Sequence, residues 1–336
     1  MKAVGFLKSL PIEEEDSLLD AELATPEVRP NDILVAIEAI SVNPADAKRR
    51  IRTAVDAPHP EPFIVGYDSV GIVEAAGPEV SGIRKGDRVW YAGDANRPGS
   101  YAELQAVDHR IASLAPTSVA PVSAASLPLV SITAWEMLFD RIQVRTDAGS
   151  GSLLVIGGAG GVGSVTLQLA RKLTGLNLVA TASRDVSTEW CMSMGAHATV
   201  DHRNLVTGFR AAHGTYADNI VQYADLSQHW DAMCELIAPQ GRIGTIVETS
   251  DKLDISALQG KSAALMWELM FTRSMFGTED MARQGQILAR MANLVDDGVV
   301  RTTETKTLHG LSANTLKEAH RIIETGSMIG KLVVEF

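Results

Sequence analysis

A glycine-rich segment near the middle of this 336-residue chain constrains the fold more than any other feature. The stretch from Gly158 to Gly163 reads Gly-Ala-Gly-Gly-Val-Gly, follows the apolar run Leu153–Ile156, and precedes a helical pattern over Thr166–Leu173. Small residues in such a turn let a pyrophosphate approach the backbone amides at the start of the helix, where the helix dipole favours negative charge. After a strand and before a helix, this pattern predicts a dinucleotide-binding site; the alternative is a glycine-rich turn without a ligand. The candidate residues are Gly158, Gly160, Gly161, Val162 and Gly163.

Short apolar runs alternate with helical segments from Leu153 to about residue 270. This alternation predicts βαβ units around a doubly wound parallel sheet, and thus an α/β fold. The expected strands lie at residues 153–156, 178–181, 220–222 and 244–247, and two of the expected helices at 166–173 and 187–194.

The first third of the chain has the pattern of a small, irregular β-barrel, because β-branched runs alternate with Gly, Pro and Asp. A helix is expected over residues 122–139, and the closing segment 330–336 reads as a strand that returns to the barrel. We therefore expect a β domain at 1–121, an inserted α/β domain at 122–270, and a return to the first domain at 271–336. The expected barrel strands lie at residues 33–40, 71–77, 88–91 and 99–104.

Composition excludes several classes of protein. Thirty Lys and Arg against 41 Asp and Glu give a net charge of −11, which argues against nucleic acid or an anionic membrane as a partner. Two cysteines cannot build a disulfide framework, acidic residues stand where a secretory signal needs an apolar core, and no apolar stretch approaches the roughly 18 residues that span a bilayer. These features predict a cytoplasmic protein.

The residues after the second expected strand bear on the choice of dinucleotide. An acid at that strand end favours NAD, whereas a hydroxyl and an arginine suit the 2′-phosphate of NADPH. Ser183 and Arg184 come first, so we favour NADPH, but Asp185 follows directly and keeps NAD open. His202 has two interpretations, a surface histidine or one that lies near the adenosine phosphate.

No metal site or nucleophilic triad is predicted. Cys191 and Cys234 are single, the eight histidines are scattered, and neither H-E-x-x-H nor C-x-x-C occurs. Covalent catalysis has no recognisable motif either.

Seven motifs, in one order from about residue 30 to the end, resemble the medium-chain dehydrogenase/reductase superfamily, and within it the zinc-independent quinone oxidoreductase branch. The resemblance implies a GroES-like barrel with an inserted Rossmann domain. Residues 267–274 also resemble a subgroup named zinc-type alcohol dehydrogenase-like. The motifs lie at residues 41–48, 66–71, 86–89, 99–103, 132–135, 158–163 and 330–331.

The resemblance also bears on zinc and on the reaction. Zinc-dependent members carry Cys where Asn43 stands and Gly-His-Glu where Gly66-Tyr67-Asp68 stands, and their four-cysteine lobe is missing here. Without a Lewis acid, the resemblance implies hydride transfer from NADPH to a quinone or an α,β-unsaturated carbonyl, whose conjugation spreads the incoming charge. The alternatives are a zinc-type alcohol dehydrogenase and a non-catalytic NADPH-binding protein.

The family's motifs suggest roles for individual residues. Asn43 is expected near the nicotinamide ribose or the acceptor oxygen, and Tyr67 is a candidate hydrogen-bond donor to that oxygen or a packed aromatic. Thr133 is expected to contact the nicotinamide or its ribose, and Lys331 to bind the cofactor. Lys48 is a further catalytic candidate, at a place where other members hold a tyrosine nearby.

The late apolar segment 263–271 precedes an expected final strand at 273–277. An open parallel sheet leaves an edge strand that must be covered or paired. The resemblance implies pairing across a two-fold axis, so we expect a homodimer with the edge near residues 270–278 buried; the alternative is a monomer that buries these side chains internally.

Overall fold

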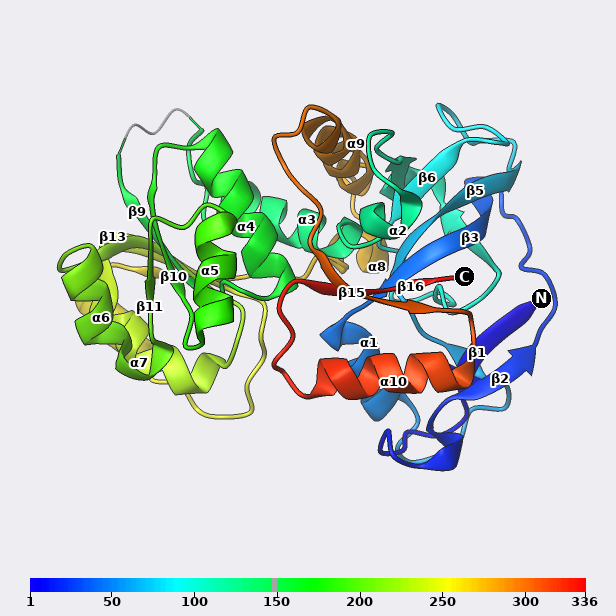
Figure 1. Cartoon of the computed structure of the whole chain (residues 1–336), viewed down its shortest axis with the longest axis horizontal. Coiled ribbons are helices and arrows are strands. Elements are labelled where there is room, and N and C mark those ends of the chain that lie inside the picture. Colours follow the sequence, from blue (N-terminus) through cyan, green and yellow to red (C-terminus); the bar gives the residue numbers. More distant parts are fainter. Residues whose placement is uncertain (147–149) are drawn as a thin grey trace. The chain divides into compact units, whose positions relative to one another are not determined.

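The computed structural model describes residues 1–146 and 150–336, and the chain divides into two compact units. Unit 1 comprises residues 1–129 and 271–336, and unit 2 comprises residues 130–270. Figure 1 shows the elements of both units in the colours of the sequence. The boundaries expected from the sequence lay at 121/122 and 270/271.

Unit 2 contains a six-stranded sheet in which every neighbouring pair of strands is parallel. Its order is that of the doubly wound dinucleotide-binding sheet, with the first strand in the middle and the fourth beside it. The predicted α/β class is therefore confirmed. In spatial order the strands are β11(Ala198–Val200), β10(Asn177–Thr181), β9(Ser152–Ile156), β12(Ala217–Gln222), β13(Ile237–Thr245) and β14(Ala264–Trp267).

The core of unit 2 forms where apolar strands meet apolar helix faces. β9 is buried at all five positions, as expected for a parallel strand that is covered on both faces. Its Leu154 and Ile156 pack in one cluster with Phe209 of α6 and Trp230 of α7. The helices that follow the strands are α4(Gly161–Leu173), α5(Asp185–Ser193), α6(Leu205–Ala212) and α7(Leu226–Leu236).

The single helix expected over 122–139 is three consecutive elements: α2(Pro121–Ala124), α3(Pro128–Trp135) and the π-helix η3(Glu136–Arg141). Pro128 explains the break, because proline is favoured in a first helical turn and disfavoured inside a helix. Among the described residues, Pro121–Arg141 is long and apolar enough to cross a membrane, with a mean hydropathy of 1.4, which corrects the expectation that no stretch approaches that length. Since 78% of the 18-residue window is buried inside the protein, its pattern is that of a core helix.

Unit 1 contains a seven-stranded sheet and a three-stranded sheet. The larger sheet has the order β15-β16-β3-β5-β6-β8, with β7 also paired to β3, and the smaller has the order β2-β1-β4. The C-terminal strand β16 pairs with the N-terminal strand β3, and β15 pairs with β16. The strands are β1(Lys2–Phe6), β2(Leu19–Glu22), β3(Asp32–Val42), β4(Phe63–Ile64), β5(Asp68–Ala76), β6(Arg88–Tyr91), β7(Leu104–Asp108), β8(Ala112–Leu114), β15(Glu304–His309) and β16(Lys331–Glu335).

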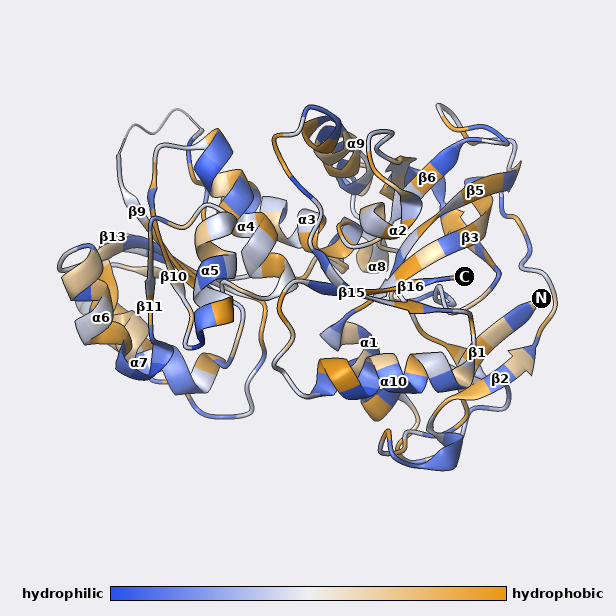
Figure 2. Cartoon of the chain, in the orientation of Figure 1, coloured by the Kyte–Doolittle hydropathy of each residue, from blue (hydrophilic) through white to orange (hydrophobic). Residues whose placement is uncertain are grey.

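Amphipathic helices complete unit 1. Figure 2 shows alternating hydrophilic and hydrophobic bands along α10(Ala313–Glu324), which buries Leu316, Ala319 and Ile323 against the core of the unit. The other α-helices that lie wholly in unit 1 are α1(Pro44–Thr53), α2, α8(Thr272–Phe276) and α9(Arg283–Asp296).

Three expected strands differ from the structure. The strand expected at 99–104 begins only at Leu104, and the strand expected at 244–247 ends at Thr245 after starting at Ile237. The expected final strand at 273–277 is helix α8, which ends at Gly277 in the left-handed conformation (φ 57°) that favours glycine after a helix. The last strand of the parallel sheet is instead β14, a few residues earlier.

Candidate functional site

The glycine-rich segment lies between β9 and α4 in unit 2, so the predicted strand–turn–helix is present. A Cβ atom on Gly158 would lie 2.8 Å from the Cβ of Ala180, and one on Gly163 would overlap the carbonyl oxygen of Gly157. Glycine at these two positions therefore allows the turn to pack closely on β10 and on itself. α4 begins at Gly161, and the amides of its first turn have no partner within the helix. Such a helix N-terminus suits a pyrophosphate.

The end of β10 presents the residues expected to select the dinucleotide. Ser183, Arg184 and Asp185 follow the last residue of β10 and are exposed. The carbonyl oxygen of Arg184 accepts a hydrogen bond from Ser187 Oγ (2.7 Å), which ties the start of α5 to the strand end. The carboxyl edge of a doubly wound sheet is where dinucleotides bind, so these side chains stand at the expected edge.

His202 follows β11 and is half-buried. Its ring lies 5.6 Å from that of the buried His229, in an edge-to-face arrangement. Burial, and then the neighbouring His202, lower the pKa of His229. His202 is therefore packed more closely than a surface histidine, and its proximity to an adenosine phosphate stays a prediction.

A buried polar network lies in unit 1 around Asp68. Its Oδ2 accepts hydrogen bonds from Ser41 Oγ (2.5 Å) and Asn43 Nδ2 (2.9 Å), and its Oδ1 accepts one from the amide of Leu129 (2.6 Å). Lys331 Nζ lies 3.1 Å from Asp68 Oδ2 and supplies the countercharge. The side chain of Asp68 has no exposed surface.

Strand register explains this gathering. Ser41 of β3 lies opposite Asp68 of β5, and Val42 lies opposite Leu332 of β16. The end of β3, the start of β5 and the start of β16 therefore meet, although they are far apart in the sequence.

Asn43 is hydrogen-bonded within this network. Its Oδ1 accepts a hydrogen bond from Lys331 Nζ, its Nδ2 donates to Asp68, and its side chain is buried. Asn43 thus joins the end of β3 and the start of α1 to this network, and its expected place near the nicotinamide ribose or the acceptor oxygen stays a prediction. Lys331 is also buried and pairs with Asp68, so its contact with a cofactor stays a prediction.

Asp46 is a second buried carboxyl group beside this network, and the sequence analysis did not single it out. Its Oδ2 accepts a hydrogen bond from the backbone amide of Asn43 (2.6 Å) at the start of α1. Burial, followed by smaller effects that include the charge of Asp68, raises its pKa from 3.8 to about 7. Asp46 and Asp68 both lie in motifs that resemble the family, and this resemblance is the one signal in the sequence that could have pointed to them.

Tyr67 and Lys48 differ in their placement. The Tyr67 ring packs against Phe271, with centroids 4.4 Å apart, and burial raises the pKa of its hydroxyl well above the usual value. Tyr67 is therefore a packed aromatic that keeps its proton, and this leaves its hydroxyl as a candidate donor. Lys48 is half-buried on α1, two positions after Asp46, and residues two apart on a helix point to different sides. Lys48 thus points to a different side of α1 from Asp46, and its catalytic role stays a prediction.

Thr133 is buried on α3 in unit 2, and its contact with a cofactor also stays a prediction.

The residues of unit 1 do not fit a catalytic zinc ion. The oxygens of Asn43 and Asp68 already hold an internal ammonium group, and Tyr67 offers a phenol with a raised pKa. Among residues 1–146 and 150–336, no group of three or more His, Cys, Asp or Glu could hold a metal ion. Zinc independence of the reaction stays a prediction.

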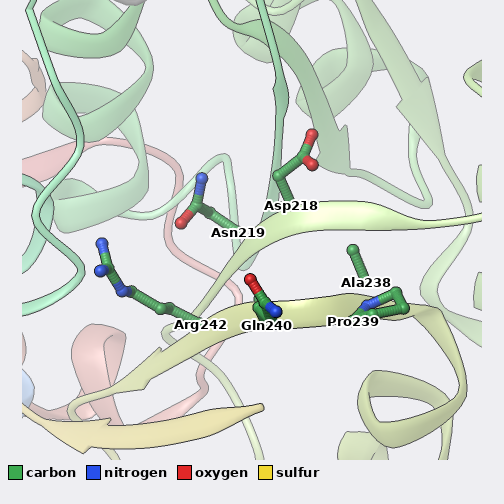
Figure 3. A pocket seen from close by; sticks show the side chains of 7 residues that line it. Asp218, Asn219, Ala238, Pro239, Gln240 and Arg242 are labelled. Carbon is green, nitrogen blue, oxygen red and sulfur yellow. The ribbon is translucent and has the colours of Figure 1, made fainter. Parts of the chain in front are cut away.

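A small open cavity of about 280 Å³ lies between β12 and β13 (Figure 3). It is at the amino edge of the parallel sheet, opposite the carboxyl edge that carries the glycine-rich turn. Polar side chains line it, among them Asp218, Asn219 and Arg242. Because dinucleotides bind at the carboxyl edge, this cavity is not the candidate cofactor site.

Two family models match the chain. Residues 29–117 match the alcohol dehydrogenase GroES-like domain, and residues 194–334 match the zinc-binding dehydrogenase family. A zinc-type alcohol dehydrogenase-like protein from Staphylococcus aureus is 39% identical over 338 residues, covering 99% of both chains. The NADPH-dependent alkenal/one oxidoreductase of Arabidopsis thaliana is 28% identical, covering 94% of this chain and 75% of its own.

Solved structures agree with these matches. A putative zinc-dependent alcohol dehydrogenase from Rhizobium etli has a TM-score of 0.96 at 44% identity, covering 100% of this chain and 98% of its own. The Escherichia coli quinone oxidoreductase, solved in complex with NADPH, shares the fold with a TM-score of 0.83 at 21% identity over the full length of both chains. Fold, glycine turn and relatives together define an oxidoreductase with a GroES-like and a Rossmann unit. The chain belongs to the medium-chain dehydrogenase/reductase superfamily.

Proposed function

We propose that this oxidoreductase transfers a hydride from NADPH to a quinone or an α,β-unsaturated carbonyl compound without zinc. The observation that carries the proposal is the Asn43–Asp68–Lys331 network, in which an ammonium group occupies the oxygen atoms that a metal would need. Without a Lewis acid, a simple carbonyl lacks the polarisation that helps it accept a hydride. A conjugated acceptor needs less help, because its π system spreads the incoming charge.

The chain's own residues supply binding and orientation. A bound NADPH would supply the hydride, and a proton from a side chain or water completes the two-electron reduction of the acceptor. The turn from Gly158 to Gly163 would hold the pyrophosphate, and Ser183 with Arg184 would hold the 2′-phosphate. Tyr67, which keeps its proton at neutral pH, would donate a hydrogen bond to the acceptor oxygen.

The names of two relatives support this assignment of cofactor and acceptor. One acts on alkenals and alkenones with NADPH, and the other is a quinone oxidoreductase solved with NADPH. The relatives named as zinc-type or zinc-dependent alcohol dehydrogenases favour the second candidate, oxidation of simple alcohols. The donor set in unit 1 argues against that candidate.

A substrate screen tests the proposal. Oxidation of NADPH should be followed with quinones, enals and enones, and reduction of NADP⁺ and NAD⁺ with simple alcohols. We expect turnover with one or more conjugated acceptors and none with alcohols. Turnover with alcohols alone would assign the alcohol dehydrogenase activity, and cofactor binding without any turnover would leave a binding protein.

We also propose that the protein works in the cytoplasm. Cys191 and Cys234 are buried free thiols, which suits a reducing compartment.

A further inference from the structure

An ion-pair cluster in unit 2 joins the π-helix η3 to the end of the parallel sheet. Arg141 Nε lies 2.6 Å from Glu268 Oε2, and its Nη2 lies 3.7 Å from Glu136 Oε2. The side chains of Glu136 and Glu268 are buried, whereas that of Arg141 is 30% exposed. Glu136 and Arg141 are five positions apart, and a π-helix brings residues at this spacing onto one side. The π-helical turn therefore aims both residues at the same place.

Two further contacts hold the π-helix against β13. A Cβ atom at Gly244 would overlap the sulfur of Met137, so glycine lets η3 lie close to the strand. Arg242 Nη1 donates to the carbonyl oxygen of Ile142 (2.8 Å), directly after η3. The position of Arg141 is thus fixed by its own element as well as by its ion pairs.

Glu268 lies at the carboxyl edge of the sheet. It follows the last residue of β14, and its amide donates to the carbonyl oxygen of Thr245 at the end of β13 (2.9 Å). Tyr223, directly after β12, is close enough that Glu268 adds to the rise that burial causes in the pKa of its hydroxyl. The cluster therefore stands at the edge formed by the ends of β12, β13 and β14.

This edge belongs to the second half of the doubly wound sheet. The first half carries the glycine turn and the strand end with Ser183 and Arg184, which suit the pyrophosphate and the adenosine phosphate. A dinucleotide that lies across both halves then places its nicotinamide part at the second half.

We propose that Arg141 is a positioning residue for the nicotinamide half of the cofactor. By pairing with Glu268, it holds the chain at the end of β14 in the place where that half lies. The inference rests on the proposed dinucleotide and is independent of the acceptor. Glu136 makes the second ion pair with Arg141.

The test separates the two halves of the cofactor. Arg141→Met removes both ion pairs, Arg141→Lys keeps a charge without the forked geometry, and Glu268→Gln removes one partner. Arg210→Met is the matched control, because Arg210 forms a 2.9 Å ion pair with Glu235 at the exposed surface of the same unit. Dissociation constants should be measured for NADPH and for 2′,5′-ADP, which contains the adenosine half alone, together with the fluorescence of bound NADPH.

We expect Arg141→Met to weaken NADPH binding by about tenfold or more and to change the fluorescence of the bound nicotinamide. Binding of 2′,5′-ADP should stay within about twofold of the wild-type value, which also shows that unit 2 is folded. Arg141→Lys and Glu268→Gln should fall between Arg141→Met and the wild type, and Arg210→Met should match the wild type.

Other results would overturn the inference. Unchanged NADPH affinity and fluorescence in Arg141→Met would show that Arg141 does not position the nicotinamide half. If Arg141→Met and Glu268→Gln weaken the binding of NADPH and of 2′,5′-ADP equally, the ion pairs contribute only to the stability of the unit. These measurements need no acceptor, so they remain decisive even if the substrate screen finds no turnover. A wild-type protein that binds neither NADPH nor 2′,5′-ADP would overturn both this inference and the proposed function.

Discussion

Lys331 Nζ lies 3.1 Å from Asp68 Oδ2 in the interior of unit 1, although 263 positions separate the two residues in the chain. Both side chains are almost wholly removed from solvent. Taking two charges out of water is costly, and each charge depends on the other once buried. The pair therefore joins the C-terminal strand β16 to the start of β5. Replacing one of the two residues should lower the free energy of unfolding.

Replacing the lysine tests this dependence. Lys331→Met leaves the Asp68 carboxylate buried without its countercharge, and we expect a loss of about 3–5 kcal/mol in the free energy of unfolding. The double variant Lys331→Met/Asp68→Asn should recover part of it, because no buried charge then lacks a partner. Lys85→Met is the control, since Lys85 pairs with Glu74 at an exposed site; its cost should be at most about 1 kcal/mol. Equal losses for Lys331→Met and Lys85→Met in urea unfolding would contradict the prediction.

Asp46 should make the stability of unit 1 depend on pH. Its pKa is raised from 3.8 to about 7 in the folded protein, so the stability that its protonated form contributes is complete below pH 3.8 and is lost as the pH rises through 7. The Asp46→Asn side chain stays neutral and can still accept the hydrogen bond from the Asn43 amide. Between about pH 5 and pH 7, the wild type should lose up to about 1.4 kcal/mol per pH unit relative to Asp46→Asn. Parallel stability profiles of the two proteins would rule this out.

Arg184 should determine the preference for NADPH over NADH. It is exposed at the carboxyl end of β10 beside Ser183, where a 2′-phosphate is expected. Loss of a charge-assisted hydrogen bond of about 1.5–3 kcal/mol predicts that Arg184→Ala binds NADPH roughly ten- to a hundredfold more weakly. Binding of NADH should barely change. Arg203→Ala is the control, because the exposed Arg203 pairs with Asp201 after the neighbouring strand. Equal affinities of the wild type for NADPH and NADH would refute the assignment.

The active protein should contain less than one zinc ion per chain. Elemental analysis of the purified protein should find clearly less than one zinc ion per chain, and treatment with a chelator should leave the rate of NADPH oxidation unchanged. The reason is that the Asn43 oxygen already accepts a hydrogen bond from the Lys331 ammonium group and burial keeps the Tyr67 hydroxyl protonated. One zinc ion per chain, removed together with activity, would overturn this interpretation.

A homodimer stays our prediction for the assembly, but we now expect the contact at β14 instead of near residues 270–278, because β14 is the last strand of the parallel sheet. β14 is the edge strand of the parallel sheet, and Trp267 and Leu269 at its end are each 52% exposed. Unpaired backbone groups beside exposed apolar side chains suit pairing with a second copy of the chain. Light scattering should give twice the chain mass of 35.9 kDa.

Two substitutions locate the contact between subunits. Trp267→Lys places a charge at the edge and should shift the protein toward the monomer. Phe276→Lys changes an exposed residue of α8, within the segment that the sequence analysis placed at the interface, and should not. A wild-type mass equal to one chain, or dissociation by Phe276→Lys alone, would count against β14.

Local pattern was enough to predict much of unit 2. The turn from Gly158 to Gly163 depends on residues adjacent in the chain, so its strand–turn–helix follows from periodicity and glycine spacing. The placement of Ser183 and Arg184 at a strand end follows in the same way. The last strand was misplaced because a short apolar run suits a strand or a helix equally; residues 264–267 form the strand, and Thr272–Phe276 forms a helix.

The sequence by itself thus determined the family, the α/β class and the cofactor turn, because these depend on motifs and on neighbours along the chain. Only the tertiary structure decided how the chemistry-bearing side chains are used. The register of β3, β5 and β16 brings Asn43, Asp68 and Lys331 together, and the π-helix brings Arg141 to Glu268. The contacts of Lys331 with Asn43 and of Arg141 with Glu268 join residues more than a hundred positions apart, and no local spacing encodes them. They arise because buried charges must find partners once the strands and helices have packed.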